Sequence, residues 1–136
     1  MLDLTKERHA HVDERLRSDI MVWLATVKPD GTPHIVPVWF LWDGDSIYIY
    51  SKPDQKIRNL KQNNAVMVAL DDTKGGSDPI WVAGEATLLP HDQALYKQPG
   101  YVEKYRSLLD KYNWTGESMA RDYSEPIKIT PTKLFA

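Results

Sequence analysis

The segment at 51–64, SKPDQKIRNLKQNN, combines a helix start with basic side chains that could bind an anion. Ser51 and Asp54 fit the capping-box spacing that begins a helix, and Pro53 suits a first helical turn. Because a helix start presents free N–H groups and a positive potential, it attracts phosphate or carboxylate groups. Three basic residues near this start would add to that attraction: Lys52, Lys56 and Arg58. The segment is therefore either a phosphate-binding site or a surface helix with solvated charges.

A helical wheel shows how these side chains would be distributed around the predicted helix. One stripe is apolar and expected to be buried: Pro53, Ile57 and Leu60. A polar flank lies beside it: Lys52, Lys56, Asn59 and Asn63. Arg58 lies nearly across the helix from Lys56, so both could reach one anion only at the helix end, where Asp54 competes for the same positive potential. The wheel leaves both interpretations open.

A second group of side chains could bind a flat ring. Five aromatic residues fall close together in the run PVWFLWDGDSIYIYS: Trp39, Phe40, Trp42, Tyr48 and Tyr50. They could pack in the core and at a subunit interface. Alternatively, one or two of them flank a planar ligand whose polar edge is bound by neighbouring groups.

Other chemistry is excluded by residue type or spacing. The chain has no cysteine, and its four histidines lack a recognisable metal-ligand spacing, so we expect no metal site. No G-x-S-x-G, G-x-G-x-x-G or Walker A motif is present. His34 lies among apolar residues and is either a packed histidine or a catalyst. If the protein is an enzyme, a bound cofactor must carry the difficult chemistry.

The overall charge and hydropathy narrow the cellular setting. The net charge is -2, without the basic excess that nucleic-acid binding favours. No apolar run approaches the ~18 residues of a membrane-spanning helix, and the first residues lack the apolar core of a signal peptide. We therefore expect a cytoplasmic protein that binds neither nucleic acid nor membranes.

The elements that must position these residues are mostly strands. Apolar and alternating runs predict strands at 20–27, 32–42, 46–51, 65–70, 79–89 and 125–136. Helices are predicted at 1–18 and 51–64, with a helical excursion at 91–124 that is interrupted at QPG. In the third strand, alternation places Ile47 and Ile49 on one face and Tyr48 and Tyr50 on the other.

Prolines and one glycine add local detail to this prediction. Pro33 and Pro37 cannot donate to a strand ladder, so their strand should lie at an edge or contain a bulge. Pro131 predicts the same for the last strand. Gly84 indicates a bulge or a close approach of two backbones.

The order of elements predicts one domain, 1–136, with a mainly β (α+β) fold. Hairpin-linked antiparallel strands favour a small barrel of about six strands with a few short helices. Several strands are apolar on both faces, and the predicted helices are too few to cover them. A second copy of the chain would bury the rest, so we expect a homodimer.

The motifs together resemble a known family. The pieces LATVKPDGTP, PVWF, DGDSIYIYS, KIRNL, AGEATLL and IKITPTKLFA resemble the split β-barrel flavin-binding family that includes pyridoxamine 5′-phosphate oxidase. The chain looks most similar to the oxidoreductases that use the deazaflavin F420. The resemblance implies a homodimeric split barrel with two cofactor sites in clefts at the dimer interface.

The resemblance also implies roles for single residues. Lys56 and Arg58 would meet the cofactor phosphate, which both can do if the phosphate lies over the first turns and the chains reach it from opposite sides. Ser51 and Lys52 would lie near it, with Asn59 a further candidate. Three residues would lie along the tricyclic ring: Pro37, Val38 and Trp39. The polyglutamate tail of F420 would need more basic groups, for which Lys28, Lys61 and Lys104 are available.

The function implied is an F420-dependent oxidoreductase that transfers hydride to an unidentified small molecule. One alternative is an FMN-binding oxidoreductase of the same fold. Another is a non-enzymatic protein that binds flavin, F420 or a tetrapyrrole. The chain lacks the C-terminal Arg- and His-containing segment of pyridoxamine 5′-phosphate oxidase itself, so we do not expect pyridoxamine phosphate as the substrate.

Overall fold

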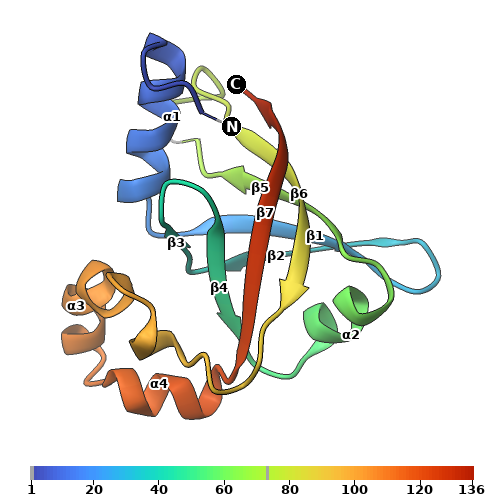
Figure 1. The fold of residues 1–136 in the computed structure, drawn as a ribbon, viewed down its shortest axis with the longest axis vertical. Helices are drawn as coiled ribbons and strands as arrows, with labels where there is room; N and C mark the ends of the chain where they lie inside the picture. The colour runs from blue at the N-terminus through green and yellow to red at the C-terminus, as the bar shows by residue number, and fades with distance from the viewer. Residues whose placement is uncertain (1, 73) are drawn as a thin grey trace.

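A curled antiparallel sheet organises the structure, a computed structural model that describes residues 2–72 and 74–136 (Figure 1). Within those residues seven strands follow the order β2-β1-β5-β6-β7-β4-β3, and every neighbouring pair is antiparallel. The strands are β1 (Val22–Val27), β2 (Pro33–Val38), β3 (Leu41–Trp42), β4 (Ile47–Ser51), β5 (Ala65–Leu70), β6 (Trp81–Leu88) and β7 (Glu125–Phe135). The predicted mainly β, antiparallel split barrel is confirmed.

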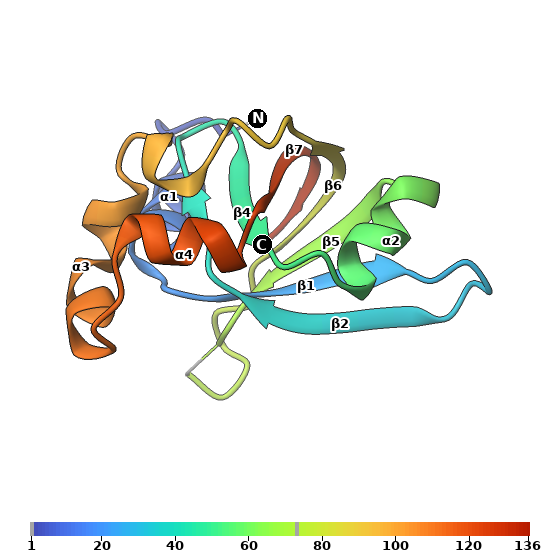
Figure 2. The same cartoon turned by 90° about the horizontal axis from the view of Figure 1, so that it is seen from below.

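Within the described residues, helices precede β1 and occupy two of the connections between strands, β4–β5 and β6–β7. They are α1 (Glu7–Ser18), α2 (Gln55–Gln62), the short 3-10 helix η1 (Leu95–Lys97), α3 (Tyr101–Lys111) and α4 (Gly116–Asp122). Figures 1 and 2 show α3 and α4 on one side of the molecule and α2 on the other, with β4 and β7 between them. In the part of the chain that the structure describes, no helix has the length and apolar character needed to cross a membrane.

The predicted strand at 32–42 is wrong in one respect, because it forms two strands, β2 and β3, separated by Trp39 and Phe40. At this break, two side chains of α3 form hydrogen bonds with the backbone of Phe40. The Phe40 N–H donates to the Tyr105 hydroxyl at 2.8 Å, and Lys104 Nζ donates to the Phe40 carbonyl oxygen at 2.7 Å. A residue bonded in this way has no backbone groups left for a strand ladder.

The predictions from proline and glycine are confirmed. Pro33 and Pro37 lie in β2, at the edge of the sheet. The register of β6 against β7 shifts between Ala83 and Gly84, and a Cβ on Gly84 would lie 2.8 Å from the Thr130 carbonyl oxygen. Gly84 therefore allows a close approach of two backbones at an irregular point of the ladder. Pro131 pairs with Gly84 at the same irregularity.

Two hydrophobic cores lie on opposite faces of β4, as its alternation predicts. Ile47 and Ile49 are fully buried in the barrel core, which α1 and α2 help to close. Tyr48 and Tyr50 face a second core, formed by the helical excursion: Leu95, Tyr101, Tyr105, Leu109 and Met119. Since burial of one large apolar side chain contributes about 1.5–3 kcal/mol, this second core fixes α3 and α4 against the sheet.

Asp78, in the loop before β6, holds α1 against the barrel. Its carboxylate lies 2.7 Å from His11 Nε2 and 2.7 Å from Arg8 Nη1, and it accepts from Arg15 Nη1 at 2.6 Å. The hydrogen bond with His11, followed by the bonds from Arg8 and Arg15, holds the pKa of Asp78 well below its usual value. The N-terminal helix is thus fastened by charge as well as by the buried side chains Val12 and Leu16.

Candidate functional site

A cavity of about 550 Å³ lies where the second core meets the sheet. The ends of β2 and β4, the segment before α2 and the α3–α4 region all contribute to it. The residues from the first half of the chain are Met21, Pro37, Val38, Trp39, Tyr50, Ser51, Lys52, Asp54 and Lys56. Those from the helical excursion are Tyr101, Tyr112, Trp114, Met119 and Tyr123. Its size is typical of small-molecule and cofactor pockets.

One part of the cavity is cationic. Lys56 is mostly buried, and its Nζ lies 2.7 Å from Asp54 Oδ2. Lys52 is exposed beside it, with its Nζ 5.4 Å from the centre of the Tyr123 ring. Two ammonium groups against one carboxylate leave a net positive charge where the chain enters α2. This part can attract an anionic group through side-chain charges.

The predicted capping box at the start of α2 is wrong. Helix α2 begins at Gln55, and Asp54 is its N-cap, accepting the Lys56 N–H at 3.2 Å. Ser51 instead ends β4, where it pairs with Glu125, and its Oγ donates to the Lys52 carbonyl oxygen at 2.7 Å. Because the sheet uses the backbone of Ser51, the chain must turn through the next residues before a helix can start. Ser51 still lines the cavity, beside Lys52.

Arg58 and Asn59 do not line the cavity. Arg58 is exposed, and its Nη2 donates to Gln55 Oε1 at 2.9 Å. Asn59 is fully buried, donating from Nδ2 to Thr26 Oγ1 at 2.9 Å and accepting from Gln55 Nε2 at 2.7 Å. The structure therefore keeps Arg58 apart from Lys56, and Asn59 ties α2 to β1.

The predicted ring-side residues Pro37, Val38 and Trp39 do line the cavity. Trp39 is held from the helical side, since its ring stacks on Tyr105 with centroids 4.4 Å apart and an interplanar angle of 4°. The Tyr105 hydroxyl in turn bonds to the backbone of Phe40, the next residue. The wall that Trp39 contributes is thus fixed by α3.

Sequence reasoning missed the wall from the helical excursion: Tyr101, Tyr112, Trp114, Met119 and Tyr123. The spacing of Tyr101, Tyr105 and Leu109 marks a buried helical face, which indicates packing and not ligand binding. Tyr112 and Trp114, which follow that helix, carry the more useful signal, because large aromatic side chains in a connection between helices are expected to pack against another segment or a ligand.

The tyrosines in the cavity can donate hydrogen bonds. Burial, with a smaller effect of neighbouring Tyr48, raises the pKa of Tyr50, and burial likewise raises that of Tyr101. Their rings meet edge to face with centroids 5.0 Å apart. Both phenols therefore keep their protons near neutral pH and serve as donors, not bases.

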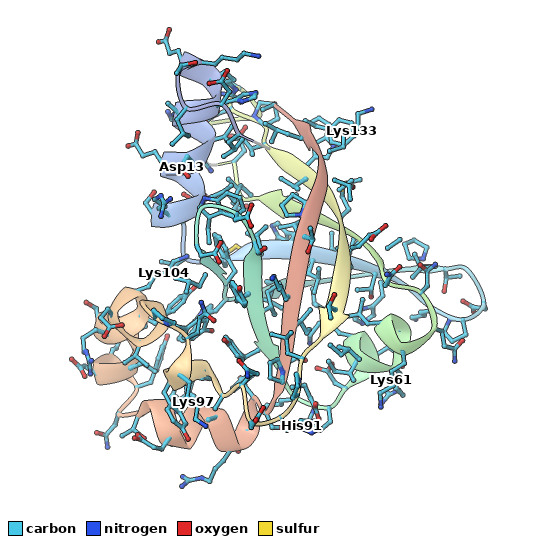
Figure 3. The ribbon with its side chains drawn as sticks, in the orientation of Figure 1. Asp13, Lys61, His91, Lys97, Lys104 and Lys133 are labelled. Atoms are coloured by element: carbon cyan, nitrogen blue, oxygen red, sulfur yellow. The ribbon has the colours of Figure 1, made fainter. Side chains whose placement is uncertain are left out.

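The remaining candidates lie elsewhere. Figure 3 shows Lys61 on α2 and Lys104 between α3 and the sheet, and neither lines the cavity. His34 lies in β2 outside the cavity, and its buried Nδ1 makes no hydrogen bond with the described residues. Those residues also contain no group of three or more His, Asp or Glu side chains arranged to hold a metal ion.

Comparison with known proteins relates this geometry to a family. The profile of the family described as pyridoxamine 5′-phosphate oxidase matches residues 9–135. No curated protein sequence matches significantly. Among solved structures, an "F420 Reductase" is 28% identical, with a TM-score of 0.69, and the match covers 90% of this chain and 94% of that one.

Two further structures share the fold at lower identity. A putative pyridoxamine 5′-phosphate oxidase from Listeria innocua is 24% identical, with a TM-score of 0.68, over 93% of this chain and 94% of the other. A FAD-binding protein from Mesorhizobium loti is 20% identical, with a TM-score of 0.68, over 92% and 90% of the two chains.

Proposed function

Because the chain belongs to the pyridoxamine 5′-phosphate oxidase family, we propose that it is an F420-dependent oxidoreductase that transfers hydride to a small molecule. The observation that carries the proposal is a single cavity with a cationic part and flat apolar walls. Similarity to an F420 reductase supports this choice of cofactor.

The residues of the cavity fit a ring joined to a phosphate. Lys52 and Lys56 would hold the phosphate, because Lys56 is buried at the cavity wall and Lys52 lies beside it. Pro37, Val38 and Trp39 would lie along the ring. When bound, F420 supplies the hydride chemistry that the side chains of this protein lack.

The contribution of the chain is binding, orientation and exclusion of water. Trp39 is fixed by its stack on Tyr105, so its side chain would lose little further conformational freedom when a planar ligand packs against it. Tyr50 and Tyr101 can donate hydrogen bonds from their protonated hydroxyls. No histidine, and no carboxylate other than Asp54, lines the cavity among the described residues, so we propose no essential general base.

FMN is the second candidate cofactor. The same lysines and the same flat wall suit its phosphate and ring, and the solved structures with this fold include a putative pyridoxamine 5′-phosphate oxidase and a FAD-binding protein. A flavin absorbance spectrum in the purified protein would favour FMN over F420. Tight binding of either cofactor without turnover of any acceptor would instead favour a carrier.

We also propose that the protein is a homodimer whose cofactor sites border the subunit interface. Trp23 and Met67 are exposed on one sheet face, and the strand register places Ile35 and Trp81 on that face with them. Pro37 pairs with Trp23 on this face and also lines the cavity, so the face and the site adjoin. An apolar area of this kind is typical of an interface.

The dimer is tested by changing the centre of that face. Met67→Glu should convert a species of twice the chain mass to a monomer in light scattering coupled to gel filtration, because a charge buried between copies would be unpaired. Tyr96→Glu is the matched control, since Tyr96 is similarly exposed but lies on η1 and should leave the dimer intact. A wild-type monomer at micromolar concentration would overturn the dimer.

The cofactor site is tested by fluorescence titration with F420 and by absorbance titration with FMN. Lys56→Ala should weaken binding of the true cofactor by at least tenfold, because a charged hydrogen bond contributes about 1.5–3 kcal/mol. Arg58→Ala is the matched control on the same helix and should have an effect below threefold if the cofactor binds in this cavity. Unchanged affinity in Lys56→Ala would exclude the assigned phosphate site.

A further inference from the structure

The backbone ladder between β1 and β2 ends beside the cavity. Two residues beyond its last pair, the same register would place Ile20 opposite Phe40. The Tyr105 hydroxyl bridges these two residues, since it accepts the Phe40 N–H at 2.8 Å and lies 2.7 Å from the Ile20 carbonyl oxygen. A side chain of α3 therefore joins the two strand ends at the point where their own ladder stops.

This bridge holds two residues of the cavity wall from outside the cavity. Met21 lines the cavity and directly follows Ile20. Trp39 also lines it and directly precedes Phe40. Continued by one residue, the β1–β2 register places Met21 opposite Trp39, on the ring side of the cavity. Because neither residue belongs to a strand, their positions depend on the Tyr105 hydroxyl that bridges their neighbours.

Lys104 bears on the direction of the hydrogen bond that Tyr105 donates. The hydroxyl has one hydrogen but lies within hydrogen-bond distance of two carbonyl oxygens, those of Ile20 at 2.7 Å and Phe40 at 2.8 Å. Lys104 Nζ already donates to the Phe40 oxygen at 2.7 Å. Since that oxygen has a donor, the hydrogen of Tyr105 is available to Ile20.

Stability alone gives little reason for a lysine at this place. Lys104 Nζ lies 3.6 Å from the centre of the Phe40 ring, and burial lowers the pKa of this lysine to about 8. Burial of its charge therefore costs stability at neutral pH. Asp19, itself paired with Arg15, offsets only part of that cost. A methionine would fill similar space at lower cost, so the lysine indicates a role other than stability.

We propose that Lys104 is a positioning residue for the cofactor ring and acts through Tyr105. It holds the Phe40 carbonyl oxygen and so directs the Tyr105 hydrogen to Ile20. The bond to Ile20 in turn keeps Met21, the next residue, in the cavity wall. In Lys104→Met the Tyr105 hydrogen turns to the Phe40 oxygen, and the Ile20 oxygen loses its donor. The inference rests on the proposed function and adds to it a residue that does not line the cavity.

The test measures binding of the ring apart from binding of the phosphate. Its probes are riboflavin and FO, the deazaflavin part of F420, because neither carries a phosphate or carboxylate that Lys104 could contact. In fluorescence titration, Lys104→Met should bind the ring of the true cofactor about fivefold more weakly, the effect of one neutral hydrogen bond. Lys104→Arg, which keeps a charged donor, should stay within twofold of wild type.

Lys97→Met is the matched control. Figure 3 shows both lysines on the helical excursion. Lys97 Nζ also donates to a backbone carbonyl oxygen, that of Asp92 at 3.1 Å, but Lys97 does not line the cavity and has no contact with the bridge. Its replacement should leave the affinity for both rings within twofold of wild type.

Tyr105→Phe removes the same bond at Ile20 by a second route. Because Lys104 acts through Tyr105, the variant with both changes should bind the ring as weakly as Tyr105→Phe alone. The chain has four methionines, so the Met21 methyl signal can be followed by NMR in the protein without any cofactor. That signal should shift in Lys104→Met and in Tyr105→Phe but not in Lys97→Met.

The outcomes that overturn this inference differ from those that overturn the proposed function. Wild-type ring affinity in Lys104→Met, or an affinity of Lys104→Arg as low as that of Lys104→Met, would remove the role of the Lys104 hydrogen bond. Losses that add in the double variant would show that Lys104 does not act through Tyr105, and an unmoved Met21 signal would show that Met21 is held by other contacts. Failure of wild type to bind either ring would overturn the proposed function, and the Met21 signal would still test the bridge.

Discussion

Removal of one hydroxyl, in Tyr105→Phe, tests how α3 is fastened to the sheet beside the cavity. The Tyr105 hydroxyl accepts the Phe40 N–H at 2.8 Å and lies 2.7 Å from the Ile20 carbonyl oxygen. Lys104 also donates to the Phe40 carbonyl oxygen, so that oxygen keeps a partner in the variant. The Phe40 N–H does not, because Phe40 is fully buried. The substitution therefore leaves one buried donor unsatisfied.

The structure gives the size of the effect. A buried donor without a partner costs about 1–3 kcal/mol, so we expect the free energy of unfolding to fall by about 2 kcal/mol. The unfolding entropy for a chain of 136 residues is roughly 0.3 kcal/mol/K at about 2.1 cal/mol/K per residue. The melting temperature should therefore fall by about 7 °C. The stack of residue 105 on Trp39 survives in a phenylalanine, so lost packing contributes little.

Tyr101→Phe is the matched control. Tyr101 lies on the same helix and is equally buried, at 2% exposure against 1% for Tyr105. Its hydroxyl makes no hydrogen bond with the described residues, so its removal should cost less than about 0.5 kcal/mol. Urea unfolding followed by circular dichroism, at one protein concentration for all variants, measures both. Equal losses in the two variants, or a loss below about 0.5 kcal/mol in Tyr105→Phe, would refute the reasoning.

Three further predictions concern stability. Gly84→Ala should cost about 1–3 kcal/mol in calorimetry, because its Cβ would lie 2.8 Å from the Thr130 carbonyl oxygen; wild-type stability would contradict this contact. Burial lowers the pKa of Lys104 to about 8, so above that pH the unfolded chain binds more protons and stability rises with pH. Between about pH 7.5 and 9.5 the rise in the free energy of unfolding, measured with urea, should be about 1 kcal/mol smaller in Lys104→Met than in wild type. Parallel pH profiles of stability in the two proteins would exclude the effect. The pKa of Asp78 is held low, chiefly by His11, so its stabilising contribution is complete above about pH 5 and is lost progressively at lower pH. Asp78→Asn should be less stable than wild type at neutral pH, and in thermal unfolding it should lose less stability than wild type between about pH 5 and 3. An equal loss of stability on acidification in both proteins would argue against the ion pairs.

Much of the fold could be predicted because its determinants are local. Alternation in β4 separates Ile47 and Ile49 from Tyr48 and Tyr50, since successive side chains of a strand point to opposite faces. Pro37 forecasts an edge strand because it lacks an N–H donor, and Gly84 forecasts a close approach because it lacks a Cβ. These properties belong to the residue and do not depend on its distant neighbours.

Where long-range pairing competes with local pattern, the local prediction fails. Ser51 has the right spacing for a helix cap, yet β7 pairs with β4 as far as Ser51, so Asp54 caps α2 instead. The strand predicted at 32–42 breaks at Phe40 because Tyr105, far along the chain, takes its backbone N–H. Hydrogen bonds to distant residues leave no trace in the sequence around either position.

The residues of the candidate site could likewise be predicted only in part. Sequence alone placed basic residues at the start of one helix and aromatic residues on the strands before it, and the cavity contains Lys56 and Trp39 from these two groups. A helical wheel gives the angle between Lys56 and Arg58 but not which of them faces a cavity. Tertiary packing determines that Lys56 and not Arg58 lines the cavity, and it also places Trp114 and Tyr112 of the helical excursion there. The physical reason is that burial of the second core sets where α3 and α4 lie, and this depends on contacts between segments distant in sequence.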